Sequence, residues 1–293
     1  MKAELLTVVK VSNSLGEGVL WNERQQAVWW TDINAALLYR YHVESGVLDV
    51  WDTPHRVACF GFIKDSDKLI VAFDIGLAIY DVTGKQVDWL VPPGFLAEGI
   101  RFNDGKVDPT GKFWAGSMVE SLPALPGSAA LYCYDPVAGM SEKISQITIS
   151  NGLCWSPDGK TMYHTDSPEN TINAYSVDRA GTTLSGQREF AKTETSVHPD
   201  GSTIDSAGGI WNAQWGGSRV VRYAPNGETD LVIDVPALQP TCVAFGGPDL
   251  SWLFVTSARE GLSDEDILKQ SEAGNLFIFR TDFKGLRAFE FRM

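Results

Sequence analysis

Several features that would assign this chain to a common functional class are missing from its 293 residues. No apolar run reaches transmembrane length, and no charged and then apolar leader stands at the start. Histidine is scarce, with four residues, and no HExxH, GxSxG or phosphate-loop motif occurs. We therefore expect no membrane partner and a cytoplasmic location, and we expect none of the familiar zinc-protease, serine-hydrolase or nucleotide-binding sites.

Positive charge and cysteine are also scarce. Lysine and arginine number 24 against 37 acidic residues, so the net charge is -13, and such a chain repels the phosphates of nucleic acids. The four cysteines are far apart in apolar surroundings, and none forms a CxxC pair. They predict buried free thiols in a reducing cytosol rather than disulfides or a thiolate metal site.

Long stretches of helical periodicity are the next absence. Short apolar runs alternate with turn residues, among 28 glycines and 14 prolines, and this pattern favours β structure. One helix is expected near residues 263–270, where Ser263 stands in a capping position before several acids. No linker or charge block divides the chain, so residues 1–293 are expected to form one domain.

A repeated sequence frame defines the architecture. The stretch "NGLCWSPDGKTMYHTD" (151–166) has counterparts that begin at residues 17, 59, 103, 200 and 241, spaced 41 to 49 residues apart. Each unit continues with a third and often a fourth apolar run, and four short strands per unit are typical of a β-propeller. A sandwich would not require so regular a repeat. We predict an all-β, six-bladed propeller with four antiparallel strands per blade, in which the N-terminal strand (4–11) closes the last blade.

The repeat phase also predicts a site. In a propeller the first strand of each blade lines the central channel, so Glu17, Asn103, Asn151 and Asp200 should converge at one end. Two carboxylates in a small volume repel each other unless a cation lies between them. An oxygen-rich set of this kind suits calcium, magnesium or manganese, and zinc or iron with several water ligands is the alternative.

Each of these residues also has a structural explanation. Asn and Asp before Gly are common turn formers, so their shared phase is what favours a site. Among the other polar residues, His164 is expected to be packed in a strand and His198 to have a loop role. Asp32 and Asp166 follow Thr in matching strands and are expected to hold blade turns.

Four segments together resemble the SMP-30/gluconolactonase/regucalcin family. They are "RFNDGKVDPTGKFWAGSM" (101–118), "SNGLCWSPDGK" (150–160), "PDGSTIDSAGGIW" (199–211) and "FGGPDLSWLFVTSAREGL" (245–262), and the resemblance extends over almost the whole chain. It implies one divalent metal held by Glu17, Asn151 and Asp200. It also implies substrate contacts from Arg101, Asn103 and Glu120. "WNAQWGG" and "YHTDS" resemble the bacterial members that open sugar-acid lactones.

The resemblance implies metal-dependent hydrolysis of a small sugar lactone. The metal would polarise the lactone or a bound water, and Asp200 would act as general base. Arg101 and Asn103 would orient hydroxyl groups of the sugar, since Arg101 lies two residues before Asn103 and shares its face in an extended strand. The alternatives are a calcium-binding regulatory propeller without turnover and a propeller that binds a protein partner through its face.

Overall fold

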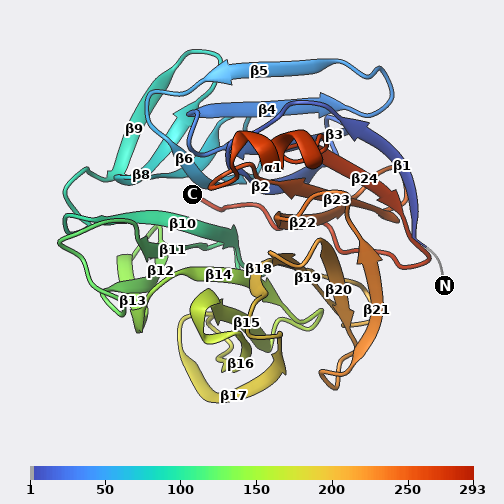
Figure 1. Ribbon diagram of the computed structural model, residues 1–293. Coiled ribbons are helices and arrows are strands. Elements are labelled where there is room, and N and C mark those ends of the chain that lie inside the picture. The colour runs from blue at the N-terminus through green and yellow to red at the C-terminus, as the bar shows by residue number, and fades with distance from the viewer. Residues whose placement is uncertain (1–2) are drawn as a thin grey trace.

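The computed structural model describes residues 3–293, so the first two residues of the expected domain lie outside the described part. Six four-stranded sheets surround one axis (Figure 1). Blade 1 contains β2 (Gly16–Asn22), β3 (Ala27–Asp32), β4 (Leu37–His42) and β5 (Leu48–Asp52). Blade 2 contains β6 (Val57–Phe62), β7 (Leu69–Phe73), β8 (Gly76–Asp81) and β9 (Gln86–Val91). Blade 3 contains β10 (Ile100–Val107), β11 (Phe113–Val119), β12 (Ala129–Asp135) and β13 (Gly139–Ile147).

The second half of the ring repeats this order. Blade 4 contains β14 (Ser150–Trp155), β15 (Thr161–Asp166), β16 (Thr171–Val177) and β17 (Leu184–Lys192). Blade 5 contains β18 (His198–Ile204), β19 (Ile210–Trp215), β20 (Arg219–Tyr223) and β21 (Thr229–Asp234). Blade 6 contains β22 (Pro240–Gly246), β23 (Trp252–Ser257), β24 (Leu276–Arg280) and β1 (Glu4–Val9). The predicted six-bladed fold is confirmed, because all six repeat positions fall on the first strand of a blade.

The N-terminal strand closes the ring as predicted. β1 is the outermost strand of blade 6 and pairs antiparallel with β24, so the last blade joins both ends of the chain. Figure 1 shows β5, β9, β13, β17 and β21 at the periphery, in the same outermost place as β1. Each blade therefore leaves only one short edge exposed to solvent.

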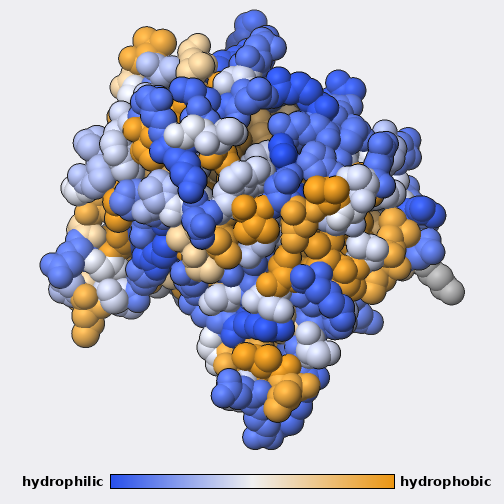
Figure 2. Space-filling model, turned by 90° about the horizontal axis from the view of Figure 1, so that it is seen from above, coloured by the Kyte–Doolittle hydropathy of each residue, from blue (hydrophilic) through white to orange (hydrophobic). Residues whose placement is uncertain are grey.

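The core lies between the blades. Six hydrophobic clusters each combine side chains of two neighbouring blades, and the largest fully buried side chains include Trp30, Trp114 and Trp211. Because each blade is covered on both faces, β3 and β7 are buried along their whole length. Figure 2 shows mainly hydrophilic residues on the face that it presents, with hydrophobic residues in separate groups.

Helices are a minor part of the structure. α1 (Asp264–Lys269) begins after Ser263, whose side chain accepts a hydrogen bond from the Asp266 backbone N–H, as predicted. The only other helix in the described residues is η1, a 3₁₀ turn at Ser167–Glu169. Among residues 3–293, no helix is long and apolar enough to cross a membrane.

Close packing of the inner strands leads to the first prediction. A methyl group on Gly61 in β6 would lie 2.5 Å from Cγ2 of Val107 in β10, the inner strand of the next blade. Gly61→Ala should therefore lower the free energy of unfolding by about 1–3 kcal/mol. Because the nearest atom belongs to a side chain, Gly61→Ala with Val107→Ala should cost less than the sum of the two single changes. Additive costs in denaturant unfolding would show that the two blades do not meet here.

Candidate functional site

A β-bulge interrupts the inner strand of every blade at the equivalent place. In each blade the register with the second strand shifts between two residues of the inner strand. In blade order the pairs are Glu17/Leu20, Val57/Cys59, Phe102/Gly105, Asn151/Cys154, Pro199/Ser202 and Pro240/Val243. A bulge bends its strand and changes the direction of the side chains beside it. The six repeat positions therefore lie at matching bends around one mouth of the channel.

Five of the six residues predicted for the site line one cavity at this mouth. Its volume is about 280 Å³, and its walls include Glu17, Arg101, Asn103, Asn151 and Asp200. All five are buried. The sixth residue, Glu120, does not line the cavity and contacts it only through Arg101.

A chain of hydrogen bonds sets the orientation of the two amides. Arg101 Nη1 donates to Asn103 Oδ1 at 2.9 Å, and Asn103 Nδ2 donates to Asn151 Oδ1 at 3.0 Å. Asn151 Nδ2 in turn donates to Ser167 Oγ at 2.9 Å. The Asn151 amide is thus held at both ends, and its oxygen keeps one lone pair for a ligand in the cavity.

An ion pair with Glu120, outside the cavity, holds Arg101 in place. Its Nε donates to Glu120 Oε1 at 2.9 Å, and Arg56 binds both oxygens of Glu120 at 2.7 and 3.0 Å. Arg101 therefore pairs with Glu120 of its own blade, and Arg56 holds Glu120 from the neighbouring blade. Hydrogen bonding from Arg56 is the main cause that lowers the pKa of Glu120, so this carboxylate stays charged.

Glu17 and Asp200 form the electrostatic centre of the cavity. They are 8% and 6% exposed, and neither forms an ion pair with a basic side chain within residues 3–293. Burial, and next the charge of Asp104, raise the pKa of Glu17 to about 8. Burial also raises the pKa of Asp200, with the Glu17 charge as the next cause. Two buried carboxylates without a cationic partner favour a bound cation between them.

The donor set fits a hard divalent ion. Glu17 and Asp200 supply carboxylate oxygens and Asn151 an amide oxygen, and all three line the same cavity. No group of three or more His, Cys, Asp or Glu side chains in the described chain has an arrangement suited to a metal. A site here would therefore combine two carboxylates with an amide and with water or substrate oxygens.

Most of the polar residues that the sequence assigned to structural roles have those roles in the fold. His164 is fully buried beside Ser150 Oγ at 2.8 Å, and burial lowers its pKa to about 3. Asp32 accepts backbone hydrogen bonds from Ser14 and Leu15, and Asp166 does the same for the loop before β14. The cysteines are free and buried, namely Cys59, Cys133, Cys154 and Cys242. His198 was expected in a loop, but it is the first residue of β18 and lines the cavity.

Part of the cavity wall was not predicted. Leu15 and Ile149 stand two residues before repeat positions, as Arg101 and His198 do, and all four line the cavity. The period-2 alternation of a strand would have identified them. Further wall residues come from second strands and loops, where the repeat frame carries no information: Met118, Ser167, Pro168, Trp215 and Glu260.

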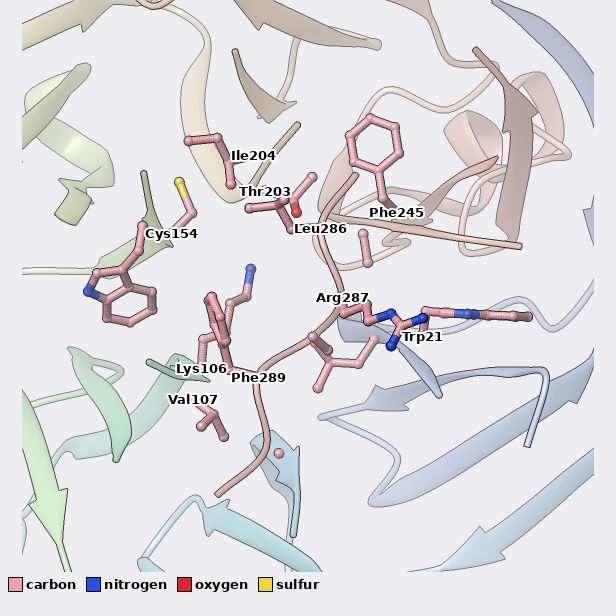
Figure 3. Close-up of a pocket in the computed structure, with 15 residues that line it drawn as sticks. Trp21, Lys106, Val107, Cys154, Thr203, Ile204, Phe245, Leu286, Arg287 and Phe289 are labelled. Atoms are coloured by element: carbon pink, nitrogen blue, oxygen red, sulfur yellow. The ribbon is translucent and has the colours of Figure 1, made fainter. Parts of the chain in front are cut away.

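The other end of the channel is crossed by the C-terminal segment. Gly285 pairs with Asp205, and Phe291 pairs with Ile63 on the opposite side of the ring. Figure 3 shows the segment around Leu286 and Phe289 across a small, mainly apolar cavity, into which Lys106 points. The chain itself therefore covers this end, and a ligand would reach Glu17 and Asp200 from the cavity described above.

The burial of Glu17 predicts the pH dependence of the ion-free protein. The ordinary pKa of Glu17 is 4.5 and its folded value is about 8, so folding favours the protonated carboxyl. This contribution is fully present below pH 4.5 and is lost as the pH rises through about 8. In chelator, Tm should therefore fall between pH 5 and 8, and Glu17→Gln should have a flatter profile. Glu265→Gln, which removes a charge from the exposed helix α1, should match the unaltered protein; coincident profiles for all three would contradict this account.

Known proteins are similar to this chain over almost its whole length. The sequence model of the SMP-30/Gluconolactonase/LRE-like region matches residues 15–259. The chain is 36% identical to the 6-deoxy-6-sulfogluconolactonase of Pseudomonas putida, over 97% of each chain. It is 38% identical to the L-arabinolactonase of Azospirillum brasilense, over 95% of this chain and 92% of that protein. The crystal structure of regucalcin from Agrobacterium tumefaciens, described as a calcium-binding protein, superposes with a TM-score of 0.92 at 32% identity, over 99% of this chain and 98% of that chain. The match of the family model and the identity to these relatives over nearly the full length show that the chain belongs to the SMP-30/gluconolactonase/LRE-like family.

Proposed function

We propose that this protein hydrolyses a sugar-acid lactone, an aldonolactone of a pentose or hexose, to the open aldonate. The observation that carries the proposal is the joint placement of Glu17, Asn151 and Asp200 with Arg101 and Asn103 in one cavity. Relatives named as lactonases over nearly the full chain support the reaction class. The free, buried cysteines fit a reducing cytosol, where we place the protein.

A divalent ion would be held by Glu17, Asn151 and Asp200. When bound, it would supply a Lewis acid that polarises the lactone carbonyl or lowers the pKa of water. Calcium, magnesium and manganese suit these oxygen ligands, and zinc or iron with added waters is the alternative. The name of the similar regucalcin structure favours calcium among them.

The protein's own side chains would divide the remaining tasks. Asp200 would accept the proton of the attacking water. Arg101 would direct guanidinium N–H groups at substrate oxygens, because the ion pair with Glu120 fixes its position. Glu120 is assigned to substrate binding through Arg101 in this proposal.

The size and lining of the cavity suit a small ring. Arg101 and Asn103 face one side with polar groups, while Leu15, Met118 and Trp215 offer apolar surface on the cavity wall. A sugar lactone has hydroxyl groups at its edge and C–H groups on its faces, so both kinds of wall have a partner. A long acyl chain would find no extended groove among these residues.

Calcium binding without turnover is the second candidate function. The similar structure described as a calcium-binding regucalcin favours it, since the same oxygen donors would serve. It does not require Arg101 and Asn103 in the cavity. Activity assays with defined metals separate the two candidates.

Metal removal tests the proposed chemistry. Exhaustive chelation should abolish the hydrolysis of sugar lactones and lower Tm, because an ion bound only by the folded state stabilises it. Asp200→Asn should retain the ion and lose turnover by at least about 100-fold, since an amide can ligate but cannot accept the proton. Undiminished hydrolysis in protein shown to be metal-free by elemental analysis would refute metal dependence.

The ion pairs behind the cavity give a graded prediction. Arg101→Ala should reduce kcat/KM on a sugar lactone by about 100-fold or more, with the fold and metal content intact. Arg56→Ala removes one partner of Glu120 but leaves the ion pair between Glu120 and Arg101. We therefore expect a smaller loss of kcat/KM, of about tenfold. Arg24→Ala breaks an exposed ion pair with Asp67 and is the matched control. Equal kinetics of the Arg101 variant and the control would remove Arg101 from the site.

A further inference from the structure

The rim of the cavity carries a third carboxylate, Glu260, which lies on the loop after β23. This loop is fixed between two blades: the backbone N–H of Glu260 donates to Ser14 O at 2.9 Å, and Gln239 Nε2 donates to Glu260 O at 3.0 Å. Asn34 Nδ2 also approaches Glu260 Oε1 at 3.3 Å. The carboxylate is exposed, yet it lines the same cavity as Glu17 and Asp200. Its place at the mouth is therefore defined by the fold.

The charges around the cavity are unequally distributed. Three carboxylates line it, those of Glu17, Asp200 and Glu260, and Arg101 is the only lysine or arginine among the described lining residues. Because Glu120 already neutralises Arg101, the three lining carboxylates give the cavity a formal charge of -3, and a divalent ion at Glu17 and Asp200 would leave -1. The positive charge would then be confined to the inner end, while the rim at Glu260 would stay negative.

Arg101 offers a ligand only its Nη2 group. Glu120 binds its Nε, and its Nη1 already donates to Phe102 O and Asn103 Oδ1. Behind it, Arg56 is shared between Glu120 and Asp74, so these four side chains form a neutral cluster. A phosphate, sulfonate or second carboxylate at the rim would thus meet the Glu260 charge, with no other lysine or arginine among the described lining residues to offset it.

We propose that Glu260 is a specificity-determining residue that selects lactones with uncharged hydroxyl substituents over lactones that carry a second, anionic group. This inference rests on the proposed function and narrows its substrate class. Membership of the family does not decide the point, because relatives are named for a sulfonated and for a neutral sugar lactone. A hydroxyl group can donate a hydrogen bond to the Glu260 carboxylate, whereas an anionic group is repelled by it.

The test compares D-glucono-1,5-lactone with the same lactone bearing a 6-phosphate. For the metal-loaded enzyme we expect kcat/KM to favour the neutral lactone by at least about tenfold, mainly through KM, and to do so less at high salt. Glu260→Gln should reduce this preference by about tenfold, and Glu260→Lys should reduce it by about 100-fold or reverse it. Glu265→Gln removes the same charge from the adjacent helix α1, outside the cavity, and should leave the preference unchanged.

Two outcomes would overturn the inference. One is equal kcat/KM for both lactones in the unaltered enzyme, and the other is a preference that stays the same in Glu260→Gln and Glu260→Lys. Both leave the proposed function intact. If neither lactone is opened, the proposed function fails instead. The charge preference is then tested by calorimetry with 1,5-anhydroglucitol and its 6-phosphate, which lack the lactone ester and cannot be opened. Tighter binding of the neutral compound that is lost in Glu260→Lys supports the preference. Equal binding of the two compounds refutes it.

Discussion

Repulsion between the carboxylates of Glu17 and Asp200 is the interaction to which the rest of the site responds. Both groups are buried on bulged inner strands of different blades. Burial is the main cause that raises the pKa of each, followed by the charge of Asp104 for Glu17 and by the charge of Glu17 for Asp200. A soluble propeller without a ligand would gain stability if either position were apolar. Their presence in a tightly packed ring therefore indicates a functional demand for negative charge at this point, and the cation that we propose would satisfy it.

The neighbouring side chains keep this charged centre in a defined geometry. Hydrogen bonds run from Arg56 through Glu120, Arg101 and Asn103 to Asn151, across blades 2, 3 and 4. Each polar group in this series has a partner, so each amide and guanidinium has one orientation. The series connects the exposed surface to the inner end of the cavity, which explains how a substitution outside the cavity could alter the groups inside it.

The sequence was sufficient to predict the blades and the positions that face the channel, because both follow from a repeat of regular length. It was not sufficient to predict the contacts between residues of different repeat units. Glu120 was expected at the substrate, but Arg56 of blade 2 holds it behind Arg101, and no spacing within one unit contains that pairing. Glu260 lies in a loop between strands, where the chain has no period. The C-terminal segment across the far end of the channel likewise lies outside the sixth unit.

Repeat phase predicts where a side chain lies, and the residue type decides what it does there. Thr241 shares the phase of Glu17 and Asp200, but its hydroxyl donates to Gly16 O and serves the junction of blades 6 and 1. Cys59 shares it as well, and its sulfur packs against Gly105 of the next inner strand. The ring is therefore asymmetric: blades 2 and 6 use this position for packing, whereas blades 1, 3, 4 and 5 present oxygen atoms. Blades 2 and 6 flank blade 1, so Glu17 stands apart from the oxygen-bearing positions of blades 3, 4 and 5. Blade 6 contributes its charge at the rim instead, through Glu260 on the loop after β23.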